Sequence, residues 1–97
     1  MRILKEQKVV VQNESIDEIE NEGLIALLGK NVTLFSNYIY TGKLIGVNKT
    51  CVKLTNAKIV YQTGVLDNNK WEDAQKLPND WYVQISQIES FGILNKE

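Results

Sequence analysis

The sequence predicts a mostly β fold, in which an N-terminal helix is followed by a five-stranded, strongly bent antiparallel barrel. Apolar residues fall at helical spacing over residues 16–28 and then alternate with a period of two from Asn31. Gly42 and Gly46 lie inside the second predicted strand, where glycine indicates a bend, a bulge or a close approach of two backbones. Several short apolar segments separated by turn residues follow, a spacing that indicates a small barrel or a highly bent sheet.

The predicted helix over residues 16–28 has both a start signal and a stop signal. Ser15, followed three residues later by Glu18, matches a capping box. The acidic residues after Ser15 suit the positive end of the helix dipole, and Gly29 can supply the C-cap. Residues 1–14 precede the helix and are predicted as an N-terminal arm or strand.

The predicted strands are separated by turns of different length. The third has a local break at Asn56-Ala57, and residues 62–80 are predicted as an enlarged loop between strands three and four. Within this loop we expect a turn at 67–69 and a helical turn at 71–77, which Pro78 ends. Residues 94–97 are predicted as a tail. The five predicted strands cover residues 31–36, 38–47, 51–54, 81–85 and 87–91, and residues 58–63 are predicted to continue as extended chain after the break.

Length and composition predict one domain that spans residues 1–97. The chain is 43% hydrophobic and 24% charged, close to the average for globular proteins. Cys51 is its single cysteine, so no intrachain disulfide can form and a reducing compartment fits. The sequence shows no signal peptide and no membrane-spanning run. We therefore expect a cytoplasmic protein with no membrane partner.

The net charge of −1 conceals a segregation of charge along the chain. Residues 15–29 hold four acids and no base, whereas residues 30–61 hold five lysines and no acid. The central block can present a local positive field to a partner. Alternatively, these lysines are the solvated faces of strands. They are Lys30, Lys43, Lys49, Lys53 and Lys58.

The sequence contains no pattern of catalytic or metal-binding residues. With no histidine and one cysteine, it has neither a zinc ligand set nor a Ser-His-Asp or Cys-His pairing. Cys51 lies in an apolar strand context, which favours an inert, buried thiol. The adjacent acids Glu72 and Asp73 are expected to face solvent. We therefore predict a protein that is not an enzyme and needs no metal or cofactor.

The stretch from Gly29 to Leu54 reads GKNVTLFSNYIYTGKLIGVNKTCVKL. A valine-rich strand, a turn, an aromatic residue, a glycine, an aliphatic residue and an amide follow one another in it without a gap. This order resembles the first signature of the Sm, Sm-like (LSm) and Hfq proteins, and residues 81–88 are similar to their second signature. The resemblance covers residues 16–57 and 81–91, and an SH3-like or other small barrel is the alternative fold. The matching positions are Val32, Leu34, Asn37, Tyr40, Gly42, Leu44, Asn48, Ile85, Ser86 and Ile88.

The resemblance implies a homo-oligomeric ring of five to seven subunits, built by strand addition. In the family, the fourth strand of one subunit pairs with the fifth strand of its neighbour, and the pore loops bind single-stranded RNA. Amide side chains can form hydrogen bonds with base edges, and lysine neutralises phosphate. The candidate RNA-binding residues are Asn48, Lys49 and Thr50 in one loop and Gln84, Ser86 and Gln87 in the other.

The chain departs from the family pattern at several positions in these loops. Asn37 replaces the usual glycine of the first turn, and Asn48 replaces the usual aspartate. Thr50 stands near the position where RNA-binding members carry a stacking residue, and residues 82–85 lack the usual Arg-Gly or Lys-His. The alternative hypothesis is therefore a ring-forming assembly or protein-interaction module that has lost RNA binding.

Overall fold

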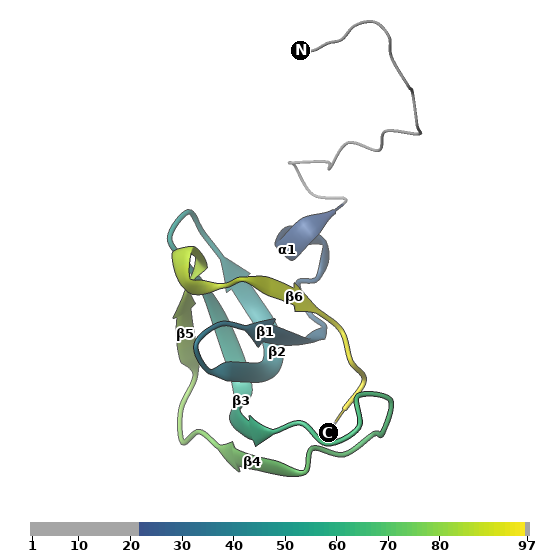
Figure 1. Cartoon of the computed structure of the whole chain (residues 1–97). Helices are drawn as coiled ribbons and strands as arrows, with labels where there is room; N and C mark the ends of the chain where they lie inside the picture. Colours follow the sequence, from purple (N-terminus) through teal and green to yellow (C-terminus); the bar gives the residue numbers. More distant parts are fainter. Residues whose placement is uncertain (1–21, 97) are drawn as a thin grey trace, which may run out of the picture.

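The computed structural model describes residues 22–96 and consists mainly of an antiparallel sheet (Figure 1). The predicted mostly β class is confirmed, but the sheet has six strands rather than five. The predicted arm over residues 1–14 and the capping box at Ser15 lie outside the described residues. The elements are α1 (Gly23–Ala26), β1 (Asn31–Phe35), β2 (Ile39–Val47), β3 (Cys51–Gln62), β4 (Asp73–Lys76), β5 (Trp81–Gln84), the 3-10 helix η1 (Ile85–Gln87) and β6 (Ser90–Gly92).

The sheet is open, which corrects the prediction of a five-stranded barrel. Its strand order is β4-β3-β2-β1-β6, and β5 also pairs with β3. The long strand β3 therefore has two partners on one edge: β5 along residues 51–54 and β4 along residues 58–62. The two ends of this path, β4 and β6, do not pair with each other.

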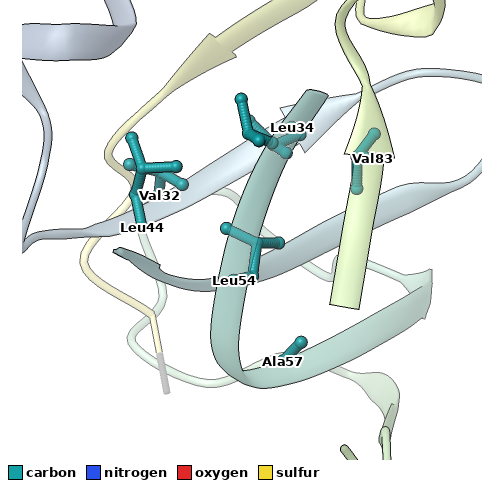
Figure 2. Packing of buried hydrophobic residues seen from close by; sticks show 7 residues of the cluster. Val32, Leu34, Leu44, Leu54, Ala57 and Val83 are labelled. Carbon is teal, nitrogen blue, oxygen red and sulfur yellow. The ribbon is translucent and has the colours of Figure 1, made fainter. Parts of the chain in front are cut away.

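A bulge bends β3 between these two halves. Figure 2 shows β3 curving strongly between Leu54 and Ala57. Three steps along β3, from Thr55 to Lys58, face two steps along β2, as expected for one extra residue in a strand. Asn56 has φ of 51°, a left-handed conformation that asparagine tolerates better than most residues. The predicted break at Asn56-Ala57 is thus a bulge inside a continuous strand.

Gly42 lies on β2 directly opposite this bulge. A Cβ atom built on Gly42 would lie 3.0 Å from both the Cα of Ala57 and the carbonyl oxygen of Thr55. These distances are shorter than most real Cβ contacts, so a side chain here would require the backbone of β3 to shift, and glycine permits the close approach of the two strands. The sequence predicted a bend at Gly42 itself, whereas the extra residue that forms the bulge lies in β3.

The predicted helix over 16–28 is not continuous through the described residues. Gly23 has φ of +76°, which is incompatible with the φ near −63° of a right-handed helix. One turn, Gly23–Ala26, remains. The predicted cap residue Gly29 does adopt a left-handed φ of +86°. Leu24 and Leu27 pack against the core.

The segment 62–80 contains a strand where a loop with a helical turn was predicted. Strand β4 has the sequence Asp-Ala-Gln-Lys, and these residue types have low intrinsic β propensity. It forms because it pairs with β3, with Lys76 opposite Lys58 and Ala74 opposite Val60. Further along, η1 occupies residues 85–87, so the last strand begins at Ser90 rather than at Gln87.

The core lies on the inner face of the bent sheet (Figure 2). Core residues alternate with other residues along the strands, as predicted from the period of two at Val32 and Leu34. No helix among residues 22–96 is both long and apolar enough to cross a membrane. The buried core cluster consists of Val32, Leu34, Leu44, Val52, Leu54, Ala57 and Val83.

Candidate nucleic-acid interface

The two loops that carry the predicted RNA-binding residues meet at one end of β3. Cys51, the first residue of β3, is paired with Gln84, the last residue of β5. The β2–β3 turn at residues 48–50 therefore lies beside η1. The backbone N–H of Ile85 donates a hydrogen bond to the carbonyl oxygen of Thr50 over 2.9 Å, which joins the two loops directly.

A hollow of about 430 Å³ lies at this junction. Four of the six predicted residues line it, namely Lys49, Thr50, Gln84 and Ser86, together with Ile85. These four side chains are exposed, so their polar groups are available to a ligand. Lysine is the charged residue of this lining, and no acid belongs to it.

Asn48 shapes the turn rather than lining this hollow. Its Oδ1 accepts hydrogen bonds from the backbone N–H of Thr50 and of Cys51, each at 2.8 Å. It also accepts one from the hydroxyl of Thr50 at 3.2 Å. This is the local pattern by which asparagine stabilises turns. The amide oxygen of Asn48 is thus engaged within its own loop and holds Lys49 at the tip.

Gln87 lies at a second hollow, which adjoins the first through Gln84. This hollow has a volume of about 190 Å³, and three tyrosines are among the residues that line it. Tyr38 and Tyr82 are 59% and 60% exposed, so their ring faces can contact a ligand. The lining residues are Ser36, Asn37, Tyr38, Tyr40, Tyr82, Val83, Gln84 and Gln87.

Tyr82 was missed as a site residue, although the sequence carried a usable signal. Val83 is buried in the core, and side chains alternate between the two faces of a strand. Tyr82 and Gln84 must therefore share the outer face of β5. The ammonium of Lys53 lies 5.5 Å from the centre of the Tyr82 ring, within the range of a cation–π contact.

The lysines of the acid-free block are dispersed over the surface instead of forming one patch. Lys49 lines the hollow between the two loops, while Lys58 lines a separate hollow near Trp71. Lys53 lies 3.9 Å from the carboxylate of Asp80, which offsets part of its charge. The local field at the loop junction therefore depends mainly on Lys49.

Other kinds of site have less support among residues 22–96. No group of three histidine, cysteine, aspartate or glutamate side chains in this range could hold a metal ion. Cys51 is a free, partly buried thiol at the start of β3.

No family model, no curated protein and no solved structure matches this chain.

Proposed function

We propose that this protein is an Sm-like, ring-forming protein that binds single-stranded RNA at the hollow between the β2–β3 turn and η1. The observation that carries the proposal is the direct contact between these loops, made by the hydrogen bond from Ile85 to Thr50. It places Lys49, Gln84 and Ser86 around one acid-free hollow. Proteins that recognise RNA sequence commonly bind unpaired bases through hydrogen bonds to the base edges and through stacking.

Each part of the interface has a distinct role in this proposal. Lys49 neutralises a backbone phosphate, and Gln84 and Ser86 form hydrogen bonds with base edges. Gln84 also borders the tyrosine hollow, so the next base along the strand can stack there. Stacking on an aromatic ring contributes about 1–3 kcal/mol per base. Tyr38, Tyr40 and Tyr82 thereby compensate for the absence of a stacking residue at Thr50.

The ring part of the proposal rests on the free edges of two strands. Among the described residues, β5 pairs with β3 on one edge alone, and β6 likewise pairs only with β1. Exposed apolar side chains accompany both strands: Trp81 and Tyr82 on β5, and Phe91 and Ile93 on or beside β6. Pairing β5 of one copy with β6 of the next would cover both edges, which soluble sheets must protect.

Sedimentation should therefore show a homo-oligomer of five to seven subunits at micromolar concentration. Phe91→Asp should shift the protein toward the 11.1 kDa monomer, because a carboxylate would be buried at the subunit contact. Val65→Asp is the matched control: Val65 is 67% exposed and lies in the loop between β3 and β4. A wild-type protein that sediments as a monomer, with circular dichroism showing a folded sheet, would refute the ring.

We expect wild-type protein to bind short oligo-U or oligo-A with micromolar affinity, measured by fluorescence anisotropy. Binding should weaken markedly with salt as counterion release is lost. Lys49→Glu should reduce affinity about tenfold or more, because each subunit of a ring repeats the change. Lys43→Glu is the matched control, since Lys43 is exposed on β2 and does not line the hollow.

One observation favours the alternative, a ring-forming interaction module without RNA binding. The Asn48 oxygen is engaged by three hydrogen bonds within its own turn, which removes one acceptor for a base. If neither RNA binds at low salt, or if Lys49→Glu binds as well as wild type, the interaction-module function replaces RNA binding. Sedimentation then still tests the ring separately.

A further inference from the structure

A third hollow, of about 220 Å³, lies near the bulge of β3 and shares no residue with the proposed RNA interface. Segments from distant parts of the sequence form it: the start of β1, the first half of β2, the bulge, the loop before β4 and the C-terminal segment. Two lysines line it and no acid does. The lining residues are Asn31, Thr41, Asn56, Lys58, Trp71 and Lys96.

Lys96 is held at this hollow by an unusually complete set of contacts. Its ammonium donates hydrogen bonds to the carbonyl oxygens of Thr63, Val65 and Lys70, at 3.1, 2.9 and 2.8 Å. It also lies 5.0 Å from the centre of the Trp71 ring. The side chain is only 7% exposed. The segment predicted as a tail is therefore anchored to the loop between β3 and β4.

Among the described residues, the charge of Lys96 is solvated by these carbonyl groups and is not paired with an acid. Among residues 22–96, no carboxylate lies within 4.0 Å of its ammonium. A buried charge acts over a longer distance than an exposed one, because less water screens it. Its field adds to that of Lys58, which is partly buried and lines the same hollow. The hollow therefore attracts anions.

The same lining offers more hydrogen-bond donors than acceptors. The side chains of Asn31 and Asn56 make no hydrogen bond within residues 22–96, so their amide groups can donate to a ligand. The indole N–H of Trp71 is buried and has no acceptor. The hydroxyl of Thr41 is already engaged, since it donates to the carbonyl oxygen of Val32 over 2.8 Å.

We infer that this hollow is a binding site for a phosphate group. Phosphate carries up to two negative charges and several acceptor oxygens, which match two ammonium groups and the free amide donors. Lys58, Asn31 and Asn56 contact the oxygens, while Lys96 contributes through its charge. A separate hollow, lined among others by Lys53, Lys76 and Asp80, is a weaker candidate, because the carboxylate of Asp80 lies 3.9 Å from the ammonium of Lys53 there. The phosphate is either a free ion or part of an RNA backbone.

Two-dimensional ¹⁵N spectra of the full chain test this site directly. Inorganic phosphate is added at constant ionic strength, with chloride as the compensating anion. The side-chain signals of Trp71, Asn31 and Asn56 should shift and saturate with added phosphate. Lys58→Gln should raise the dissociation constant about tenfold, the loss expected for one charge-assisted hydrogen bond. Lys43→Gln removes an exposed lysine outside the hollow and should bind phosphate as wild type does.

Three results would overturn the inference: no saturable shift, the same shifts with chloride alone, or unchanged binding by Lys58→Gln. A second titration with short oligo-U distinguishes the two sources of phosphate. If RNA shifts the same three signals and inorganic phosphate competes, the site binds the RNA backbone. If RNA leaves these signals unchanged while inorganic phosphate binds, the ligand is the free ion. Lys49→Glu tests the loop junction independently, so failure of one site is distinguishable from failure of the other.

Discussion

Gly42→Ala is expected to lower the free energy of unfolding by about 3 kcal/mol, at the upper end of the usual cost of overpacking. The new Cβ would lie 3.0 Å from two backbone atoms of β3, the Cα of Ala57 and the carbonyl oxygen of Thr55. Backbone atoms in a paired strand cannot rotate away as a flexible side chain can. The alanine must therefore push β2 away from the bulge, which disturbs the pairing that places Ala57 in the core.

Gly46→Ala is the control for this prediction. Gly46 lies on the same strand, and a Cβ there would meet the Cβ of Lys53 at 3.6 Å, an ordinary van der Waals contact. Its effect should stay within about 1 kcal/mol and can be slightly stabilising, because alanine restricts the unfolded chain. Urea titrations of both variants at one protein concentration provide the measurement. Equal midpoints for the two variants would show that the close approach at Gly42 does not constrain the fold.

Much of the sheet was predictable because its strands carry their own signals. Val32 and Leu34 alternate with polar or exposed residues, and the turn at Asn48 is stabilised by its own side chain. Such features depend on residues close in sequence, so they can be recognised without knowing the fold. A glycine inside a predicted strand, Gly42, also indicated a local irregularity there. Its cause, a bulge in another strand, became visible only with the pairing of β2 and β3.

Strand β4 could not be predicted for the opposite reason. The sequence Asp73–Lys76 contains no β-branched or aromatic residue, so its extended conformation is imposed by the free edge of β3. The helix over 16–28 shows a related limit. Apolar spacing favours a helix that continues through Gly23. The same spacing does not reveal that Gly23 adopts a positive φ, which interrupts the helix. Local patterns therefore identified the central strands better than the connecting segments.

The loop junction was predicted in composition but not in geometry. The resemblance to Sm-like proteins inferred from the sequence indicated both loops as candidate sites. The pairing of Cys51 with Gln84 brings these loops together. The tyrosine hollow was not foreseen as a unit, because Tyr38 and Tyr82 are far apart in sequence. Lys96 was missed altogether: a lone lysine near a terminus carries no signal that three distant carbonyl groups surround it.

Leu54→Ala should cost about 2–5 kcal/mol of stability, the usual range for truncating a fully buried leucine. Leu54 is 0% exposed and lies opposite Leu44 on β2 and Trp81 on β5. Its removal leaves a cavity at the point where three strands meet. Native domains have total stabilities of about 5–15 kcal/mol, so the variant should lose a substantial share of its stability and unfold at a clearly lower temperature than wild type.

Ile45→Ala provides the comparison that makes the Leu54 result interpretable. Ile45 is 43% exposed and directly follows the buried Leu44, so its truncation removes a similar volume without opening a core cavity. We expect a loss of less than about 1 kcal/mol, as for most surface substitutions. Thermal and urea unfolding should be followed at equal protein concentration, because assembly would raise apparent stability. Equal losses for the two variants would mean that the inner face of the bent sheet is not the core.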